Sequence, residues 1–132
     1  MEVLLDASFL IYLIVPTSGM EEELAGFYRD LIKDHEVCTD VLVLDEAIFI
    51  SKKKYSVPYR KSIEFIDEYI LPNVRVLPIG IEEYLLARRN IIKYDLKLSD
   101  AIHLAVMENH GLQSIVTEDE DFRRLPVSVM WL

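Results

Sequence analysis

Short apolar runs alternate with longer amphipathic stretches along this chain. The first run, Val3–Leu5, is continuously apolar, which is typical of a central strand buried on both faces of a sheet. Residues 20–35 form one of the longer stretches, with apolar side chains recurring every three to four positions, as on one face of a helix. Strands that alternate with helices in this way predict an α/β domain with a largely parallel sheet.

The boundaries of the predicted elements follow from capping and helix-breaking residues. Pro16 ends the first helix, residues 17–19 form a turn, and Asp40 and Ser99 cap later helices. Strands are expected at residues 3–5, 37–39, 74–79, 114–117 and 127–131, the last as an edge strand. Helices are expected at residues 7–15, 20–35, 41–53, 58–71, 82–94 and 99–109. In the fourth helix the side chains expected to face inward are Ile63, Phe65, Ile66, Tyr69 and Ile70.

The composition is that of one folded domain spanning residues 1–132. Hydrophobic residues make up 52% of the 132 residues, so the chain can bury a core without help from disulfides. Its only cysteine, Cys38, excludes an intrachain disulfide and a cysteine zinc site. The apolar N-terminal segment lacks the basic residues that begin a secretory signal, and Asp6 interrupts it. We therefore expect a soluble, cytoplasmic protein.

The charge of the chain restricts how it could bind nucleic acid. Its formal net charge is -9, whereas an ordinary nucleic-acid binder presents a basic face to the phosphates. This objection weakens if some of the acids hold a divalent cation, because the cation then supplies the positive charge that a phosphate meets.

Two acids follow predicted strands at the point where each strand ends. Asp6 comes directly after Val3–Leu5, and Asp119 comes two residues after Thr117. The carboxyl ends of parallel strands meet at one edge of a sheet, where sites form in α/β proteins. We therefore expect these two carboxylates to lie close together, although Asp6 is also placed to cap the helix that follows it.

Two further acids lie on predicted helices. Asp100 is in a first helical turn, where the helix dipole favours an acid by about 0.3–1 kcal/mol, so a structural role alone would explain it. Glu46 projects among apolar neighbours three and four positions away, where an unpaired charge would be costly. Asp45 has similar neighbours, so periodicity does not choose between Asp45 and Glu46.

Four segments of the chain resemble, in order and spacing, the four sequence blocks of the PIN-domain family. They are LLDASFLI at residues 4–11, VLVLDE at 41–46, YDLKLSDAIHLA at 94–105 and SIVTEDEDF at 114–122. The resemblance covers essentially the whole chain and implies a three-layer α/β/α fold around a central, mostly parallel sheet. It also implies a Mg²⁺- or Mn²⁺-dependent endoribonuclease, often the toxin of a VapBC-type toxin–antitoxin pair.

The resemblance assigns roles to individual residues, position by position. The catalytic metal ligands would be Asp6, Glu46, Asp100 and Asp119, with Asp121 as an accessory acid and Ser8 and Thr117 as supporting polar groups. The extra acids Glu118 and Glu120 leave open whether Asp119 or Asp121 is the fourth ligand. Carboxylate oxygens are the ligands that Mg²⁺ prefers, and a metal-bound water makes a protein general base unnecessary.

The partners implied by the resemblance are RNA, an antitoxin protein and a second copy of the chain. Lys52, Lys53 and Lys54 form the longest basic run and are candidates for contacting the RNA backbone, although such a run is usually a solvated surface. His103 lies one turn after Asp100 in an apolar helix, so we expect a hydrogen-bonded core or interface histidine rather than a base.

Three other functions stay open at this point. A PIN fold can serve as an RNA- or protein-binding scaffold without catalysis, although all four acids are present here. A phospho-acceptor receiver module is also acidic and of this size, but it needs paired acids after its first strand, where Asp6 stands alone. A haloacid-dehalogenase-type phosphatase needs Asp-x-Asp at that place, and this chain has Asp6-Ala7-Ser8.

Overall fold

The computed structural model describes residues 2–16 and 19–132, and within them it forms one five-stranded sheet. The strand order is β3-β2-β1-β4-β5, and every pairing is parallel. The strands are β1 (Glu2–Leu5), β2 (Glu36–Asp40), β3 (Arg75–Leu77), β4 (Ser114–Val116) and β5 (Ser128–Met130). The prediction of an α/β fold with a mostly parallel sheet is confirmed, with β5 at the edge as expected.

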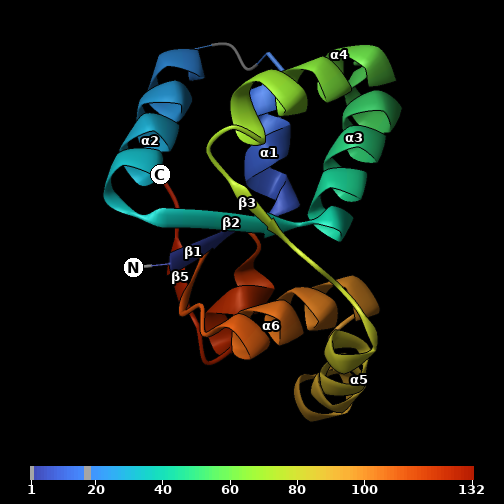
Figure 1. Ribbon diagram of the computed structural model, residues 1–132. Helices are drawn as coiled ribbons and strands as arrows, with labels where there is room; N and C mark the ends of the chain where they lie inside the picture. Colours follow the sequence, from blue (N-terminus) through green and yellow to red (C-terminus); the bar gives the residue numbers. More distant parts are fainter. Residues whose placement is uncertain (1, 17–18) are drawn as a thin grey trace.

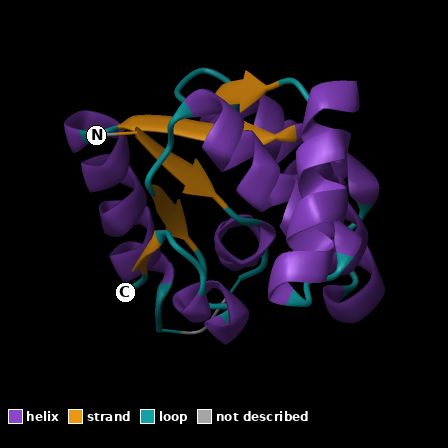
Figure 2. Cartoon of the chain, turned by 90° about the horizontal axis from the view of Figure 1, so that it is seen from below, coloured by secondary structure: helices purple, strands orange, loops and turns teal. Residues whose placement is uncertain are grey.

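Helices cover both faces of this sheet, which gives three layers (Figure 1). The helices on one face are α1 (Ala7–Ile14), α2 (Glu21–Asp34), α3 (Val41–Tyr55) and α4 (Tyr59–Phe65), the last continued by the π-helical turn η1 (Ile66–Ile70). The other face carries α5 (Ile81–Tyr94), α6 (Leu98–His110) and the 3-10 helix η2 (Glu120–Arg124). Figure 2 shows the twist of the strands between these layers. None of the helices in the described ranges is both long enough and apolar enough to cross a membrane.

The central strand β1 supplies side chains to two separate hydrophobic cores. Val3 and Leu5 join the core under α1, α2 and α3, whereas Leu4 joins the core against α5 and α6. This division follows from the alternation of side chains across a strand. All three side chains are fully buried, and each contributes roughly 1.5–3 kcal/mol by leaving water. A strand that is apolar at every position is therefore what this architecture requires.

The predicted elements agree with the observed ones to within a few residues, but the predictions for three residues are wrong. Ile63 and Tyr69, expected to face inward, are 44% and 51% exposed. Helix α4 instead turns Ser62 inward, and η1, with its wider turn, continues the buried side with Ile66 and Ile70. Helix α6 begins at Leu98, so Ser99 lies inside it and is not the cap.

The predicted turn at residues 17–19 lies mostly outside the described residues, because Thr17 and Ser18 are not among them. Gly19 is described and has φ of 84°, a left-handed conformation that favours glycine.

Buried polar side chains fix α5 against α6. Glu83 accepts hydrogen bonds from the backbone N–H of Gly80 at 2.7 Å and from the amide of Asn109 at 2.6 Å. Asn90 donates to Glu108 at 3.0 Å. Pairing these groups removes the cost of burying them unsatisfied. The contacts hold α6 in a defined orientation, and α6 carries Asp100 and His103.

Candidate metal centre

The acids of interest meet at the carboxyl edge of the three inner strands. Asp6 follows β1, Asp40 ends β2, and Thr117 follows β4 and leads into Asp119. Strand β1 pairs with both β2 and β4, so these residues come from neighbouring strands. The N-terminal turn of α6 adds Asp100. The ends of these neighbouring strands therefore share one edge of the sheet.

Asp6 is fixed in place by the segment that follows β4. Its backbone N–H donates to the carbonyl of Val116 at 3.0 Å, and Thr117 Oγ1 donates to its carboxylate at 2.7 Å. Asp6 occupies the cap position of α1, yet its side chain makes no capping hydrogen bond. Capping therefore does not explain this buried acid. Burial raises the pKa of Asp6, and the charge of His103 and the bond from Thr117 partly offset that rise.

Thr117 and Ser8 connect the acids at this edge. Thr117 Oγ1 accepts from the backbone N–H of Asp119 at 3.0 Å while its own proton goes to Asp6. Ser8 Oγ lies 3.4 Å from Thr117 Oγ1 and accepts from the N–H of Glu118 at 3.3 Å. The two hydroxyls thus tie the first turn of α1 to the loop after β4. A supporting role of Ser8 and Thr117 at a metal stays a prediction.

Three acids form the most compact part of the site. Asp100, Asp119 and Asp121 each place a carboxylate oxygen within 4.8 Å of the others. Asp119 also accepts from the backbone N–H of Asp121 at 2.9 Å, which holds these two acids in one loop. The loop therefore brings both candidates for the fourth ligand, Asp119 and Asp121, to Asp100.

The surroundings of Asp100 favour its neutral form. Its pKa is raised to about 6, first by burial and then by the charges of Asp6 and Asp119, against the opposing effect of Lys97 and His103. A divalent cation among these carboxylates would remove this penalty, because it favours their ionised forms. The donors are oxygen atoms, which suits Mg²⁺ or Mn²⁺ better than zinc or copper.

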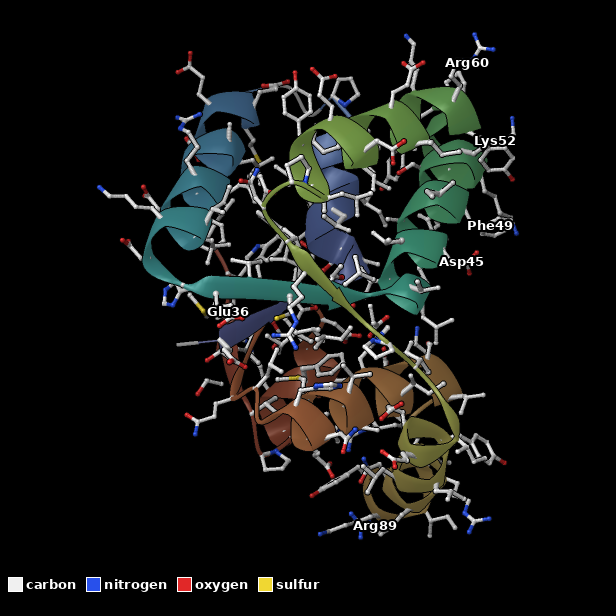
Figure 3. The ribbon with its side chains drawn as sticks, in the orientation of Figure 1. Glu36, Asp45, Phe49, Lys52, Arg60 and Arg89 are labelled. Atoms are coloured by element: carbon white, nitrogen blue, oxygen red, sulfur yellow. The ribbon has the colours of Figure 1, made fainter. Side chains whose placement is uncertain are left out.

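Glu46, rather than Asp45, faces the site. Its Oε1 lies 3.4 Å from Nε2 of His103 on α6. Asp45 is exposed and points outward from α3, on the side of the molecule where Phe49 and Lys52 also project (Figure 3). The ambiguity that the apolar pattern of this helix left open is resolved by the orientation of α3 against α1 and the sheet.

His103 is fully buried between two carboxylates. Its Nδ1 lies 2.7 Å from Oδ2 of Asp40, and the other oxygen of Asp40 accepts from the backbone N–H of Val43 at 2.9 Å. Burial alone would lower the pKa of His103, but the hydrogen bonds to Asp40 and Glu46 and the nearby negative charges raise it to about 10. The expected hydrogen-bonded core histidine is present, and it is a buried cation among acids.

Not all predicted ligands belong to the compact group. Asp6 and Glu46 fall outside the 4.8 Å group of Asp100, Asp119 and Asp121. Their charges still act within the site, because Asp6 raises the pKa of Asp100 and Glu46 raises that of Asp6. The site therefore consists of three adjoining carboxylates with two more at its inner side.

The extra acids beside the fourth position are engaged elsewhere. Glu118 accepts from the hydroxyl of Tyr12 at 3.0 Å, and Glu120 forms an ion pair with Arg123 at 3.2 Å. Neither belongs to the compact group of acids. Neither pairing can be predicted from the local pattern, because both depend on how the loop after β4 is folded.

Asp40 is a further acid at this edge, although its sequence context predicts only a helix cap. It does cap α3, since its side chain accepts from the backbone N–H of Val43. Asp40 also ends β2 at the same edge as Asp6, so the strand-end argument would have drawn attention to it.

The predicted basic run lies at the exposed C-terminal end of α3. Lys52 stacks over the ring of Tyr59 at 5.1 Å and Lys53 over that of Phe49 at 5.5 Å, both to the ring centroid. Lys53 is seven residues beyond Glu46 on the same helix, which is roughly 10 Å along the axis. A role of Lys52, Lys53 and Lys54 in RNA binding stays a prediction.

A cavity of about 590 Å³ lies apart from the acids. It is formed by the C-terminal half of α1, by α2 and by η1, and its lining is mostly apolar, including Leu24, Tyr28 and Phe65. Tyr12 lines it as well and donates a hydrogen bond to Glu118, in the loop after β4. None of the five clustered acids lines it.

The chain matches the PIN domain over residues 3–127 and belongs to the PIN-domain family. No curated protein matches it in sequence.

Several solved structures similar to this chain are toxins or toxin–antitoxin complexes. VapC20 of Mycobacterium tuberculosis, a toxin that cleaves the sarcin-ricin loop, has 20% identity and a TM-score of 0.75, with 92% of each chain covered. VapBC2 of Rickettsia felis, bound to a DNA fragment of its promoter, has 16% identity and a TM-score of 0.73, covering 99% of this chain and 98% of that one. A toxin–antitoxin complex of Klebsiella pneumoniae has 22% identity and a TM-score of 0.72, covering 97% and 95%. These likenesses establish the fold.

The raised pKa of Asp100 predicts a pH-dependent cost to the metal-free protein. Because the folded state holds this proton more tightly than the unfolded state, stability falls as the pH rises from about 4 to about 6. Asp100→Asn removes that cost. We expect the variant to exceed the native chain by roughly 1–2 kcal/mol at pH 7.5, allowing for solvent screening, and to match it near pH 4. Chemical denaturation of both proteins in the presence of a chelator measures this difference. An equal difference at both pH values would contradict it.

Proposed function

We propose that this chain is a metal-dependent endoribonuclease that uses Mg²⁺ or Mn²⁺ to hydrolyse phosphodiester bonds of RNA. The ligands would be Asp6, Glu46, Asp100 and Asp119, with Asp121 as an accessory acid. The observation that carries the proposal is the group of three carboxylates within 4.8 Å at the strand edge of a PIN domain. PIN domains bind divalent metals, and this edge offers oxygen donors alone.

The chemistry at this edge divides between the ion and the protein. A bound divalent ion supplies a water of lowered pKa and offsets the charge that develops on the phosphate. Asp6 stays oriented because Thr117 and the backbone of β4 hold it. His103 is not available as a general base, since carboxylates occupy both of its ring nitrogens. The acids would bind and orient the ion, and no side chain is then needed as a general base.

Substitution of the acids provides the direct test. Asp6→Asn and Asp100→Asn should each lower cleavage of single-stranded RNA by at least roughly 100-fold, because the site loses a charged ligand. Asp45→Asn makes the same change of charge on an exposed residue next to Glu46, and this control should cleave like the native chain. Cleavage is measured with Mg²⁺ or Mn²⁺ and again with excess chelator. Activity that survives both site substitutions, or the chelator, would refute the proposed mechanism.

We infer that a partner protein controls this activity, as an antitoxin does. The inference rests on the similarity to chains solved in toxin–antitoxin complexes. An acidic edge is suited to a partner that presents Arg or Lys, because a guanidinium or ammonium group pairs with the carboxylates in place of the metal.

Expression in a bacterial host tests the toxin assignment. The native chain should arrest growth when it is produced alone, whereas Asp6→Asn and Asp100→Asn should not. A matched co-expressed partner should restore growth and lose that ability when its basic residues are replaced. High yield of the native chain with normal growth would argue for an RNA-processing enzyme instead.

We also propose that two copies pair through α5. Exposed apolar side chains, Ile81, Tyr84, Leu85 and Ile92, follow one side of this helix. In an antiparallel pair of α5 helices centred on Leu85, Glu82 of one copy would face Arg88 of the other. The charges on this surface are thus complementary to themselves under a two-fold axis, as a symmetric dimer needs.

The mass of the protein in solution tests this pairing. The native chain should sediment as a dimer, and Leu85→Asp should sediment as a monomer because it places two like charges at the axis. Ile63→Asp on α4 is the matched control, since Ile63 and Leu85 are 44% and 43% exposed. A native monomer, or equal effects of the two substitutions, would rule the surface out.

A further inference from the structure

A chain of three hydrogen bonds runs from the start of α3 through α6 to Glu46. The backbone N–H of Val43 donates to one oxygen of Asp40 at 2.9 Å, and the other oxygen lies 2.7 Å from Nδ1 of His103. Nε2 of His103 then lies 3.4 Å from Oε1 of Glu46. Asp40 and His103 are both fully buried, so these links lie inside the protein and end at the acidic edge.

The two sides of the imidazole ring differ in what they do for the fold. The bond from Nδ1 to Asp40 is short and buried, and it alone suffices to connect β2 to α6. The contact of Nε2 with Glu46 is longer and reaches a side chain that is 31% exposed. A longer contact to a partly exposed acid adds little to stability. Its effect falls on the orientation of Glu46.

Within the described part of the chain, His103 alone orients the carboxylate of Glu46. The carboxylate of Glu46 has no other hydrogen-bond partner there. Because Asp40 accepts at Nδ1, the ring cannot turn over without losing its buried partner. The Nε2 atom is therefore presented to Glu46 in a fixed direction.

We propose that His103 is a positioning residue of the metal site, whose ring, oriented by Asp40, holds the carboxylate of Glu46 towards the other acids. This inference rests on the proposed metal-dependent function. Groups that orient metal ligands typically contribute about 10- to 100-fold in metal affinity.

Two amide substitutions separate the two sides of the ring. The amide nitrogen of His103→Asn can occupy the place of Nδ1 and keep the bond to Asp40, while that of His103→Gln can occupy the place of Nε2 and keep the bond to Glu46. Both variants place the same neutral amide group at position 103. A difference between them therefore reports which nitrogen matters, not the loss of charge.

The positioning role predicts opposite orders for metal affinity and for stability. His103→Gln should bind Mn²⁺ roughly tenfold more tightly than His103→Asn, measured from the electron paramagnetic resonance signal of free Mn²⁺. His103→Asn should have the higher thermal unfolding temperature without metal, since it keeps the buried bond. Equal Mn²⁺ affinities, or the same order in both measurements, would show that His103 is only a structural cross-link and overturn the proposal.

Asp40→Asn provides a second test that does not depend on how His103 variants fold. Asparagine caps a helix about as well as aspartate, so the bond from Val43 is kept while the hold on the ring weakens. This variant should bind Mn²⁺ more weakly than Asp45→Asn, which makes the same change of charge at an exposed position. Equal affinities of the two variants would overturn the proposal.

The outcomes separate this inference from the proposed function. A native chain that binds no Mn²⁺ would refute both. A native chain that binds Mn²⁺ and cleaves no RNA would refute only the nuclease, and the order of the His103 variants would still decide the positioning role.

Discussion

Carboxylates gathered at one edge of the sheet repel one another, and this repulsion is the main constraint on how the acidic edge is built. Two carboxylates 4.8 Å apart repel by about 3 kcal/mol at an effective dielectric constant of about 20. The fold tolerates this because the buried helix α6 carries Asp100, while the hydrogen bond from the backbone of Asp121 to Asp119 holds the two loop acids together. Burial raises the pKa of both Asp6 and Asp100, and the charges of neighbouring carboxylates raise each pKa further. A site strained in this way before any ion arrives favours the binding of one.

Helix α6 holds Asp100 and His103 at the acidic edge. Every residue from Asp100 to Met107 is buried, so the helix is packed on all sides between the sheet and α5. Its first turn carries Asp100, and one turn later it carries His103, the cation that lowers the pKa of both Asp6 and Asp100. The hydrogen bonds of Glu83 and Asn90 to residues near the end of α6 keep the helix from sliding. Packing far from the site thus fixes the geometry within it.

How far the sequence predicts this structure depends on the range of the interactions involved. The apolar run Val3–Leu5 requires a central buried strand, so the strand end at Asp6 and the shared edge follow from local pattern. Helix α3 is different, because apolar residues surround both Asp45 and Glu46 and only the packing of the helix distinguishes them. The pair of Asp40 and His103 joins residues 63 positions apart, and no local period encodes it. The outward turn of Ile63 likewise depends on how α4 and η1 pack.

Under the proposed function, the net charge of -9 makes RNA binding depend on the bound ion. Without an ion, the carboxylates at the strand edge repel a phosphate, and the exposed lysines at the end of α3 lie roughly 10 Å further along that helix. An RNA strand drawn to those lysines is therefore repelled by the acidic edge until a divalent ion is bound there. Substrate binding and metal binding are then coupled, because each supplies charge of the sign that the other needs. An acidic chain can in this way act on a polyanion only when its ion is in place.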